Sequence, residues 1–247
     1  MQVADNIASQ GHKVIIFSLE QSRFELVSKA LSRITHINKP ADARKHTEIM
    51  QKENIDEVTQ RAIADYQSTI APNEIIEEGN FNTNVDTIRE YIADYIANTK
   101  ERPTIVIDYL QILAPSNTKY TDKQQIDYNV TTLKKISRDF NIPIIVISSF
   151  NRQNYYQNVT LEAFKESGGI EYTADVLLGM QLRVLRDIKR TADGKLKDED
   201  KKIVDDASKE IPRQIELVCL KNRSGQKFNT ELDFNPVFNH LYEPRNY

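Results

Sequence analysis

Short runs of β-branched and other apolar residues, each followed abruptly by polar residues, constrain the fold of this chain more than any other feature. Three such runs span residues 14–17, 104–107 and 143–147. Runs that are apolar on both faces are typical of strands buried on both sides, as in a parallel sheet covered by helices. A weaker run at residues 74–78 predicts a further strand, at an edge of the sheet.

Segments of helical periodicity lie between these runs. After a capping-box pattern at Ser22 and Glu25, apolar residues recur every three or four positions as far as Ile34. The same period predicts helices in four more segments, residues 1–10, 55–66, 85–95 and 126–140. Strands that alternate with helices are the order of βαβ units, whose crossovers are right-handed. We therefore expect an α/β fold with a mostly parallel sheet flanked by helices.

The C-terminal third has a different pattern. Residues 175–178 predict another buried strand, whereas residues 215–219 and 228–234 alternate apolar and polar side chains on either side of a turn. That alternation is typical of an antiparallel hairpin with one buried face. The stretch 186–212 is charged and has little apolar periodicity, which predicts a surface excursion between strands. Because no repeat or low-complexity linker interrupts the sequence, we expect a single domain over residues 1–247.

Composition narrows the classes of function. The net charge of -3 argues against a protein that coats nucleic acid by bulk positive charge, although a local groove needs only clustered cations. No apolar stretch approaches the ~20 residues that cross a bilayer, and the N-terminus lacks the pattern of a signal peptide. The single cysteine, Cys219, excludes an internal disulfide, and the four scattered histidines argue against a structural zinc site. We expect a cytoplasmic protein with no membrane partner.

Polar residues follow three of the predicted strands: Glu20, Asp108 and Ser149. Ligands of open parallel sheets bind at the carboxyl ends of the strands, so neighbouring strands would bring these side chains to one edge. Two carboxylates at such an edge suit phosphoryl chemistry, in which one holds Mg²⁺ and the other orients or deprotonates the attacking water. Taken alone, each of these acids is more often an ordinary turn residue at the end of a strand. On three strands together, the functional and the ordinary interpretations are about equally favoured.

The phosphate-binding loop that would complete such a site is missing from these 247 residues. A Walker A loop, G-x-x-x-x-G-K-[ST], wraps the phosphates with backbone N–H groups and a lysine. Of the seven glycines only Gly194 precedes a lysine, and Leu196 follows that lysine within the charged stretch. The helix expected at residues 1–10 is of the kind that follows a P-loop.

Five segments, in the same order along the chain, carry the motifs of one family. They are residues 17–22, 105–113, 148–152, 165–175 and 221–225. With them the chain resembles, over nearly its whole length, the C-terminal RecA-like ATPase domain of DnaB-type replicative DNA helicases. The resemblance implies a RecA-like P-loop NTPase core that is N-terminally truncated here, with the first strand and the P-loop absent.

The resemblance also implies roles at the nucleotide. Glu20 would activate the hydrolytic water, Asp108 of the Walker B segment would hold Mg²⁺, and Ser149 would lie in the sensor segment. Lys221 and Arg223, on an exposed turn, would reach the ATP of the neighbouring subunit, and a planar guanidinium suits a γ-phosphate across an interface. A solvated arginine is the simpler alternative.

DNA contacts are implied as well, at Arg152, Lys165, Glu166 and Gly168. A glycine permits close approach of the backbone to a phosphodiester, although a flexible loop would have the same composition. Two positions depart from the family. Ser149 stands where the family has a glutamine, which affects signalling between nucleotide and DNA. Lys165 replaces an arginine, which keeps the charge and loses the bidentate fork.

The function implied is that of a motor domain in a hexameric ring, coupling ATP hydrolysis to translocation on single-stranded DNA and unwinding. ATP and Mg²⁺ would be its cofactors, and a primase or helicase loader a further partner. Without a P-loop this chain alone is expected to hydrolyse little ATP. Two alternatives stay open: another RecA-fold ATPase, such as a recombinase or clock-type ATPase, and a non-catalytic DNA-docking or assembly module derived from the helicase. A P-loop encoded upstream of Met1 would favour the motor, and a true start codon there the module.

Overall fold

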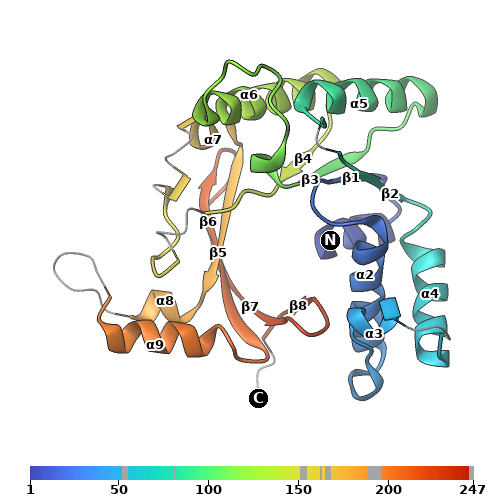
Figure 1. The fold of residues 1–247 in the computed structure, drawn as a ribbon, viewed down its shortest axis with the longest axis vertical. Helices are drawn as coiled ribbons and strands as arrows, with labels where there is room; N and C mark the ends of the chain where they lie inside the picture. Colours follow the sequence, from blue (N-terminus) through green and yellow to red (C-terminus); the bar gives the residue numbers. More distant parts are fainter. Residues whose placement is uncertain are drawn as a thin grey trace. The chain divides into compact units, whose positions relative to one another are not determined.

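The computed structural model describes residues 1–51, 55–80, 82–150, 155–161, 163–164, 168–188 and 196–244. These residues form two compact units, Met1–Ser149 and Phe150–Tyr247, each described by itself below (Figure 1). Within these ranges no helix is both long enough and apolar enough to cross a membrane.

A four-stranded parallel sheet forms the centre of the first unit. Its strands are β1 (Val14–Ser18), β2 (Glu74–Glu78), β3 (Thr104–Asp108) and β4 (Ile144–Val146), in the order β2-β1-β3-β4. All residues of β1 are buried, as expected for a strand with a neighbour on each side and helices on both faces. The predicted parallel sheet is confirmed, including the edge position of residues 74–78.

The other edge strand, β4, differs from its prediction. It is shorter than the apolar run, and Ile145 and Ile147 are 37% and 41% exposed. The expectation of burial on both faces was wrong here, because an apolar run reports which side chains can be buried and not what covers them.

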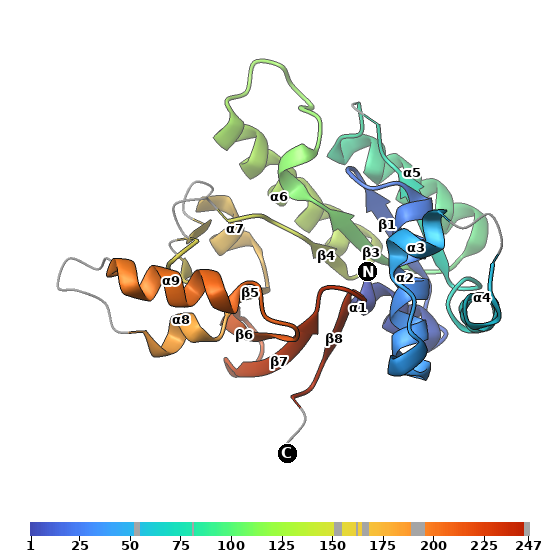
Figure 2. The same ribbon diagram turned by 60° about the horizontal axis from the view of Figure 1, so that its bottom comes forward.

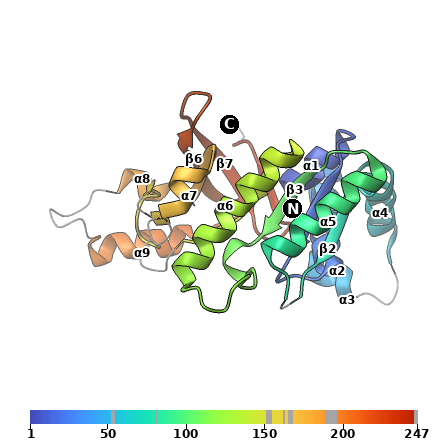
Figure 3. The same ribbon diagram turned by 90° about the horizontal axis from the view of Figure 1, so that it is seen from above.

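Helices cover both faces of the parallel sheet (Figure 1). They are α1 (Gln2–Ser9), α2 (Arg23–Asn38), α3 (His46–Gln51), α4 (Glu57–Thr69), α5 (Val85–Thr99) and α6 (Asp122–Phe140). One core packs α1, α2 and α4 against Val14 and Ile16 of β1. Since side chains alternate along a strand, Ile15 and Phe17 point to the other face, where Phe17 packs edge-on against Tyr91 of α5. Figure 3 shows α5 and α6 side by side.

Helix starts follow local capping chemistry. The Ser22 hydroxyl accepts a hydrogen bond from the Glu25 backbone N–H at the start of α2, at 3.2 Å. Asn84 and Thr121 form capping boxes at the starts of α5 and α6. Each of these bonds satisfies a backbone donor that a helix leaves unpaired. The predicted cap at Ser22 agrees with the observed start of α2, whereas α6 begins at Asp122, before the predicted segment 126–140.

The second unit is built on an antiparallel sheet. Its strands are β5 (Val176–Leu182), β6 (Arg213–Asn222), β7 (Asn229–Asn235) and β8 (His240–Tyr242), in that order. Its helices are α7 (Gly168–Thr173), α8 (Val184–Asp187) and α9 (Asp198–Ala207). The predicted hairpin is confirmed as β6–β7. Helices α8 and α9 pack through Leu185, Leu196 and Val204, so the charged stretch contains a helix with a buried anchor (Figure 2).

Two details of this sheet depart from the sequence pattern. Along β5, Val176, Leu178 and Met180 are exposed and alternate with buried positions, so the strand is not buried on both faces. On β6 the buried residues are Cys219 and, unexpectedly, Glu216. A buried carboxylate requires hydrogen-bond partners, and the sequence pattern does not reveal them.

Three side chains donate to the Glu216 carboxylate. They are Gln181 Nε2 at 2.7 Å, Arg186 Nη1 at 3.2 Å and Asn229 Nδ2 at 3.2 Å. These donors come from β5, α8 and β7, so the buried charge ties three elements to β6.

The buried ion pair between Asp5 of α1 and Arg33 of α2 gives a test of stability in the first unit. Their side chains are only 2% and 4% exposed. Burial lowers the pKa of the Arg33 guanidinium to about 10, so it stays charged at neutral pH. Replacing Asp5 by Ala removes the ion-pair partner of that buried charge and should lower the free energy of unfolding by about 3–5 kcal/mol in urea titrations.

The control is Glu25→Ala, which removes a more exposed ion pair with Lys29 on the same helix. This variant should lower the free energy of unfolding by about 0.5 kcal/mol. Equal losses for the two variants would contradict the assigned importance of burial.

Candidate functional site

Two carboxylates lie at the carboxyl-end edge of the parallel sheet. Ser18, the last residue of β1, is in register with Asp108, the last residue of β3. The ladder continues one residue further, because the Leu19 backbone N–H donates to the Asp108 carbonyl at 3.0 Å. Glu20 is the next residue and is exposed, whereas Asp108 is half-buried. The structure therefore brings Glu20 and Asp108 to the same edge.

Ser149 lies at this edge as well. The Ile147 N–H donates to the Ile107 carbonyl at 3.0 Å, which keeps the chain after β4 beside β3. The Gln111 side chain then donates to Ser148 Oγ at 2.8 Å and to the Ser149 carbonyl at 3.3 Å. Its amide oxygen accepts from the Ser149 N–H, also at 3.3 Å.

Gln111 is the residue of this edge that the sequence did not single out. It lies within the segment 105–113, which resembles Walker B, so its position was marked but its partner was not. By bonding both donor and acceptor groups of the Ser148–Ser149 segment, its amide fixes how that segment runs past Asp108.

The donor set at the edge fits the metal side of a nucleotide site. In the described part of the chain, no group of three or more His, Cys, Asp or Glu residues could hold a metal ion by itself. Mg²⁺ is commonly bound through one or two carboxylates and takes its other ligands from phosphates and water. The 247 residues contain no Walker A sequence, so the edge offers carboxylates without a phosphate cradle of that type.

Lys221 and Arg223 lie together in the second unit, at the end of β6. Lys221 is in the strand, and Arg223 begins the turn that follows. Lys221 Nζ donates to the Glu171 carbonyl at 2.7 Å, and Arg223 Nη1 pairs with Asp175 Oδ1 at 2.8 Å. Both cations therefore bind groups at the C-terminal end of α7.

Of the four residues predicted to contact DNA, the structure describes Gly168. Arg152, Lys165 and Glu166 lie outside the described residues. Gly168 is described and is the first residue of α7. Glu20, Asp108 and Ser149 belong to the first unit, and Gly168, Lys221 and Arg223 to the second.

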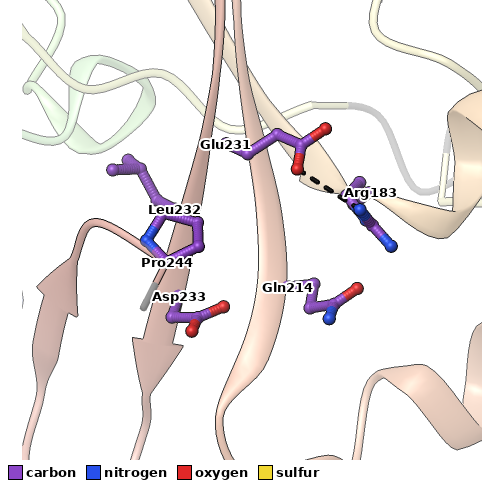
Figure 4. Close-up of a pocket in the computed structure, with 6 residues that line it drawn as sticks. All are labelled: Arg183, Gln214, Glu231, Leu232, Asp233 and Pro244. Carbon is purple, nitrogen blue, oxygen red and sulfur yellow. Dashed lines mark hydrogen bonds and ion pairs between the residues drawn. The ribbon is translucent and has the colours of Figure 1, made fainter. Parts of the chain in front are cut away.

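The second unit contains a small pocket. It is lined by Arg183, Gln214, Glu231, Leu232, Asp233 and Pro244 (Figure 4). Hydrogen bonds from Arg186 and Arg183 hold the pKa of Glu231 below its ordinary value. Gln214 is near the start of β6, at the opposite end of the strand from Lys221. The pocket is therefore separate from the Lys221–Arg223 pair.

Comparisons with known proteins agree with this geometry. A family model described as the DnaB-like helicase C terminal domain matches residues 1–243. The replicative DNA helicase DnaB of Mycoplasma pneumoniae is 25% identical over 232 residues, covering 90% of this chain and 43% of the relative. DnaB of Helicobacter pylori strain 26695 is 26% identical over 248 residues, covering 91% and 48%. The chain thus spans about half the length of these curated relatives.

Solved structures show the same fold. A DnaB-like replicative helicase, whose structure was determined with its interactions with primase, superposes with a TM-score of 0.75 at 19% identity. The match covers 98% of this chain and 53% of that one. The ATPase domain of G40P gives a TM-score of 0.76 at 20% identity and covers 98% and 78%. The expected RecA-like α/β fold is confirmed.

The motifs quoted from the sequence, the parallel sheet and the match over residues 1–243 lead to one assignment. This chain belongs to the family of DnaB-like helicase C-terminal domains.

Proposed function

We propose that this chain is the motor domain of a cytoplasmic, hexameric replicative DNA helicase, which couples ATP hydrolysis to translocation on single-stranded DNA and unwinding. One observation carries the proposal: Glu20 and Asp108 share the carboxyl-end edge of a parallel sheet in a member of the DnaB-like helicase family. The similar relatives named above are replicative DNA helicases, which supports the same reading.

Each residue of the edge has a distinct task in this proposal. The exposed Glu20 carboxylate takes the proton of the attacking water, and the half-buried Asp108 carboxylate binds the metal. Ser149, oriented by Gln111, is a short side chain that reaches a phosphate only through water. Mg·ATP, when bound, supplies the transferable phosphoryl group and offsets the charge that develops on it.

The second unit supplies the contacts outside the subunit. Lys221 and Arg223 act on the nucleotide of a neighbouring copy, where a guanidinium fork matches phosphate oxygens. Arg152, Lys165, Glu166 and Gly168 contact the DNA strand. A primase or a helicase loader is the proposed further partner, since one structural neighbour was described with its primase interactions.

A second candidate is a DNA-docking or assembly module that does not hydrolyse ATP. A Walker A sequence encoded upstream of Met1 would favour the motor over this candidate, and a true start codon there would favour the module. Another RecA-fold ATPase is a third candidate, and duplex unwinding by the complete gene product distinguishes it from the helicase.

The first test concerns Glu20 in the complete gene product. Glu20→Gln should lower the DNA-stimulated rate of ATP hydrolysis by about 10²–10⁴-fold, because glutamine keeps the size and shape of the side chain but cannot accept the proton of the attacking water. Phosphate release is measured with and without single-stranded DNA.

Glu78→Gln is the matched control. Glu78 is in register with Ser18 at the same edge, but it accepts the Arg23 N–H at 2.6 Å, a bond that glutamine retains.

The 247-residue chain alone should hydrolyse almost no ATP. Appreciable hydrolysis by that chain, abolished by Glu20→Gln, would overturn the proposed need for a separate phosphate cradle.

The second test concerns single-stranded DNA. Lys165→Ala should weaken binding, measured by fluorescence anisotropy of a labelled oligonucleotide. It should also reduce the slope of log K against log salt by about 0.7, the value for one phosphate contact. Lys202→Ala, which removes an exposed lysine of α9, is the control and should change neither quantity. The same slope for Lys165→Ala and the unchanged chain would contradict the assigned contact.

A further inference from the structure

Helix α7 ends among the side chains of two cations from the β6 strand end. Lys221 Nζ donates to the carbonyls of Glu171 and Tyr172, at 2.7 and 3.4 Å. Arg223 Nη2 donates to the Tyr172 carbonyl as well, at 3.2 Å. The two residues proposed to act on a neighbour's nucleotide are thus bound within their own subunit.

This arrangement matters for α7 because the helix is short. Six residues are well below the length at which a helix is stable alone, so α7 depends on its contacts. Ile170 is buried and anchors one side of the helix. At the C-terminal end, cations that bind the last carbonyls satisfy acceptors without an intrahelical partner and complement the helix dipole.

Asp175 binds Arg223 through both its side chain and its backbone. Its carboxylate pairs with Nη1 at 2.8 Å, and its carbonyl accepts the Arg223 N–H at 2.9 Å. Both side chains of the ion pair are 50% exposed. A guanidinium binds carboxylate and phosphate oxygens with the same geometry. An exposed ion pair of this kind is weak and changes the equilibrium between the paired and unpaired side chains only a few-fold. A phosphate that reaches this turn can therefore displace the carboxylate.

We propose that Asp175 is a positioning residue that occupies the place of a phosphate on Arg223. A phosphate that displaces it takes both ends of the guanidinium fork, so Nη2 leaves the Tyr172 carbonyl and Lys221 alone holds the C-terminal end of α7. This rests on the proposed function, which assigns Arg223 to a neighbour's nucleotide and Gly168 to the DNA strand. Nucleotide arrival at the turn then loosens the helix that begins at Gly168. By linkage, the factor by which phosphate at Arg223 changes the affinity of α7 for single-stranded DNA equals the factor by which DNA at α7 changes the affinity of Arg223 for phosphate.

The first measurement is the affinity of the 247-residue chain for inorganic tripolyphosphate, followed by titration calorimetry at constant ionic strength. Asp175→Asn should raise the affinity about three- to fivefold, because the competing carboxylate is gone. Arg223→Ala should lower it at least as much. Asp206→Asn is the matched control, since it removes the same charge from an exposed pair with Lys209 and should have no specific effect.

Hydrogen exchange provides a second measurement that needs no substitution. The Ala174 N–H donates to the Ile170 carbonyl at 3.1 Å, and its exchange reports whether the end of α7 is closed. Tripolyphosphate should speed exchange of this amide several-fold in the unchanged chain. The Ser208 N–H, which bonds the Val204 carbonyl of α9, should be unaffected.

Two outcomes would overturn the proposal: an affinity unchanged by Asp175→Asn, or an Ala174 amide that exchanges at the same rate with saturating tripolyphosphate. Failure of the proposed function has a different signature. If the unchanged chain does not bind single-stranded DNA, the strand contact is wrong while the Asp175–phosphate exchange can still be observed. If it binds DNA but α7 does not respond to phosphate, the coupling is wrong and the strand contact stands.

Discussion

The parallel ladder between β1 and β3 is the constraint on which the candidate nucleotide edge depends. The register of Ser18 with Asp108 is fixed because every residue of β1 is buried. A slip by one residue would turn each buried side chain to the opposite face, where a different set of helices packs. The burial that stabilises the sheet therefore also fixes where Glu20 leaves it.

The two units use charge in different ways. In the first unit the Asp5–Arg33 pair is almost fully buried and joins two helices. In the second, the Asp175–Arg223 pair is half-exposed and lies at a strand end. Loss of a partner is costly in a buried pair, whereas an exposed pair exchanges partners readily. Exposure thus separates an ion pair that maintains the fold from one suited to a change of state.

The sequence predicted those features that depend on local pattern. The strands of the parallel sheet followed from β-branched runs, the starts of α2 and α5 from a polar cap and from apolar period, and the β6–β7 hairpin from alternation. It did not predict the exposed side of β4 and β5, the buried Glu216 or the contact of Gln111 with Ser149. Each of these depends on a partner distant in sequence, such as Asn229 for Glu216. The same holds for Lys221 and Arg223, whose contacts with α7 lie about fifty residues away.

Gly79 packs closely against Leu19, the residue that precedes Glu20. Its N–H donates to the Ser18 carbonyl at 2.8 Å, which continues the β1–β2 ladder past the end of β2. A Cβ at this position would come within 2.2 Å of Leu19 Cδ2, so a larger residue would require the Leu19 side chain to move. Leu19 is half-buried, and the next residue, Glu20, is exposed. The carboxylate that the proposal assigns to water activation thus leaves the sheet directly after two residues, Ser18 and Leu19, whose backbone groups are bonded to the chain on either side.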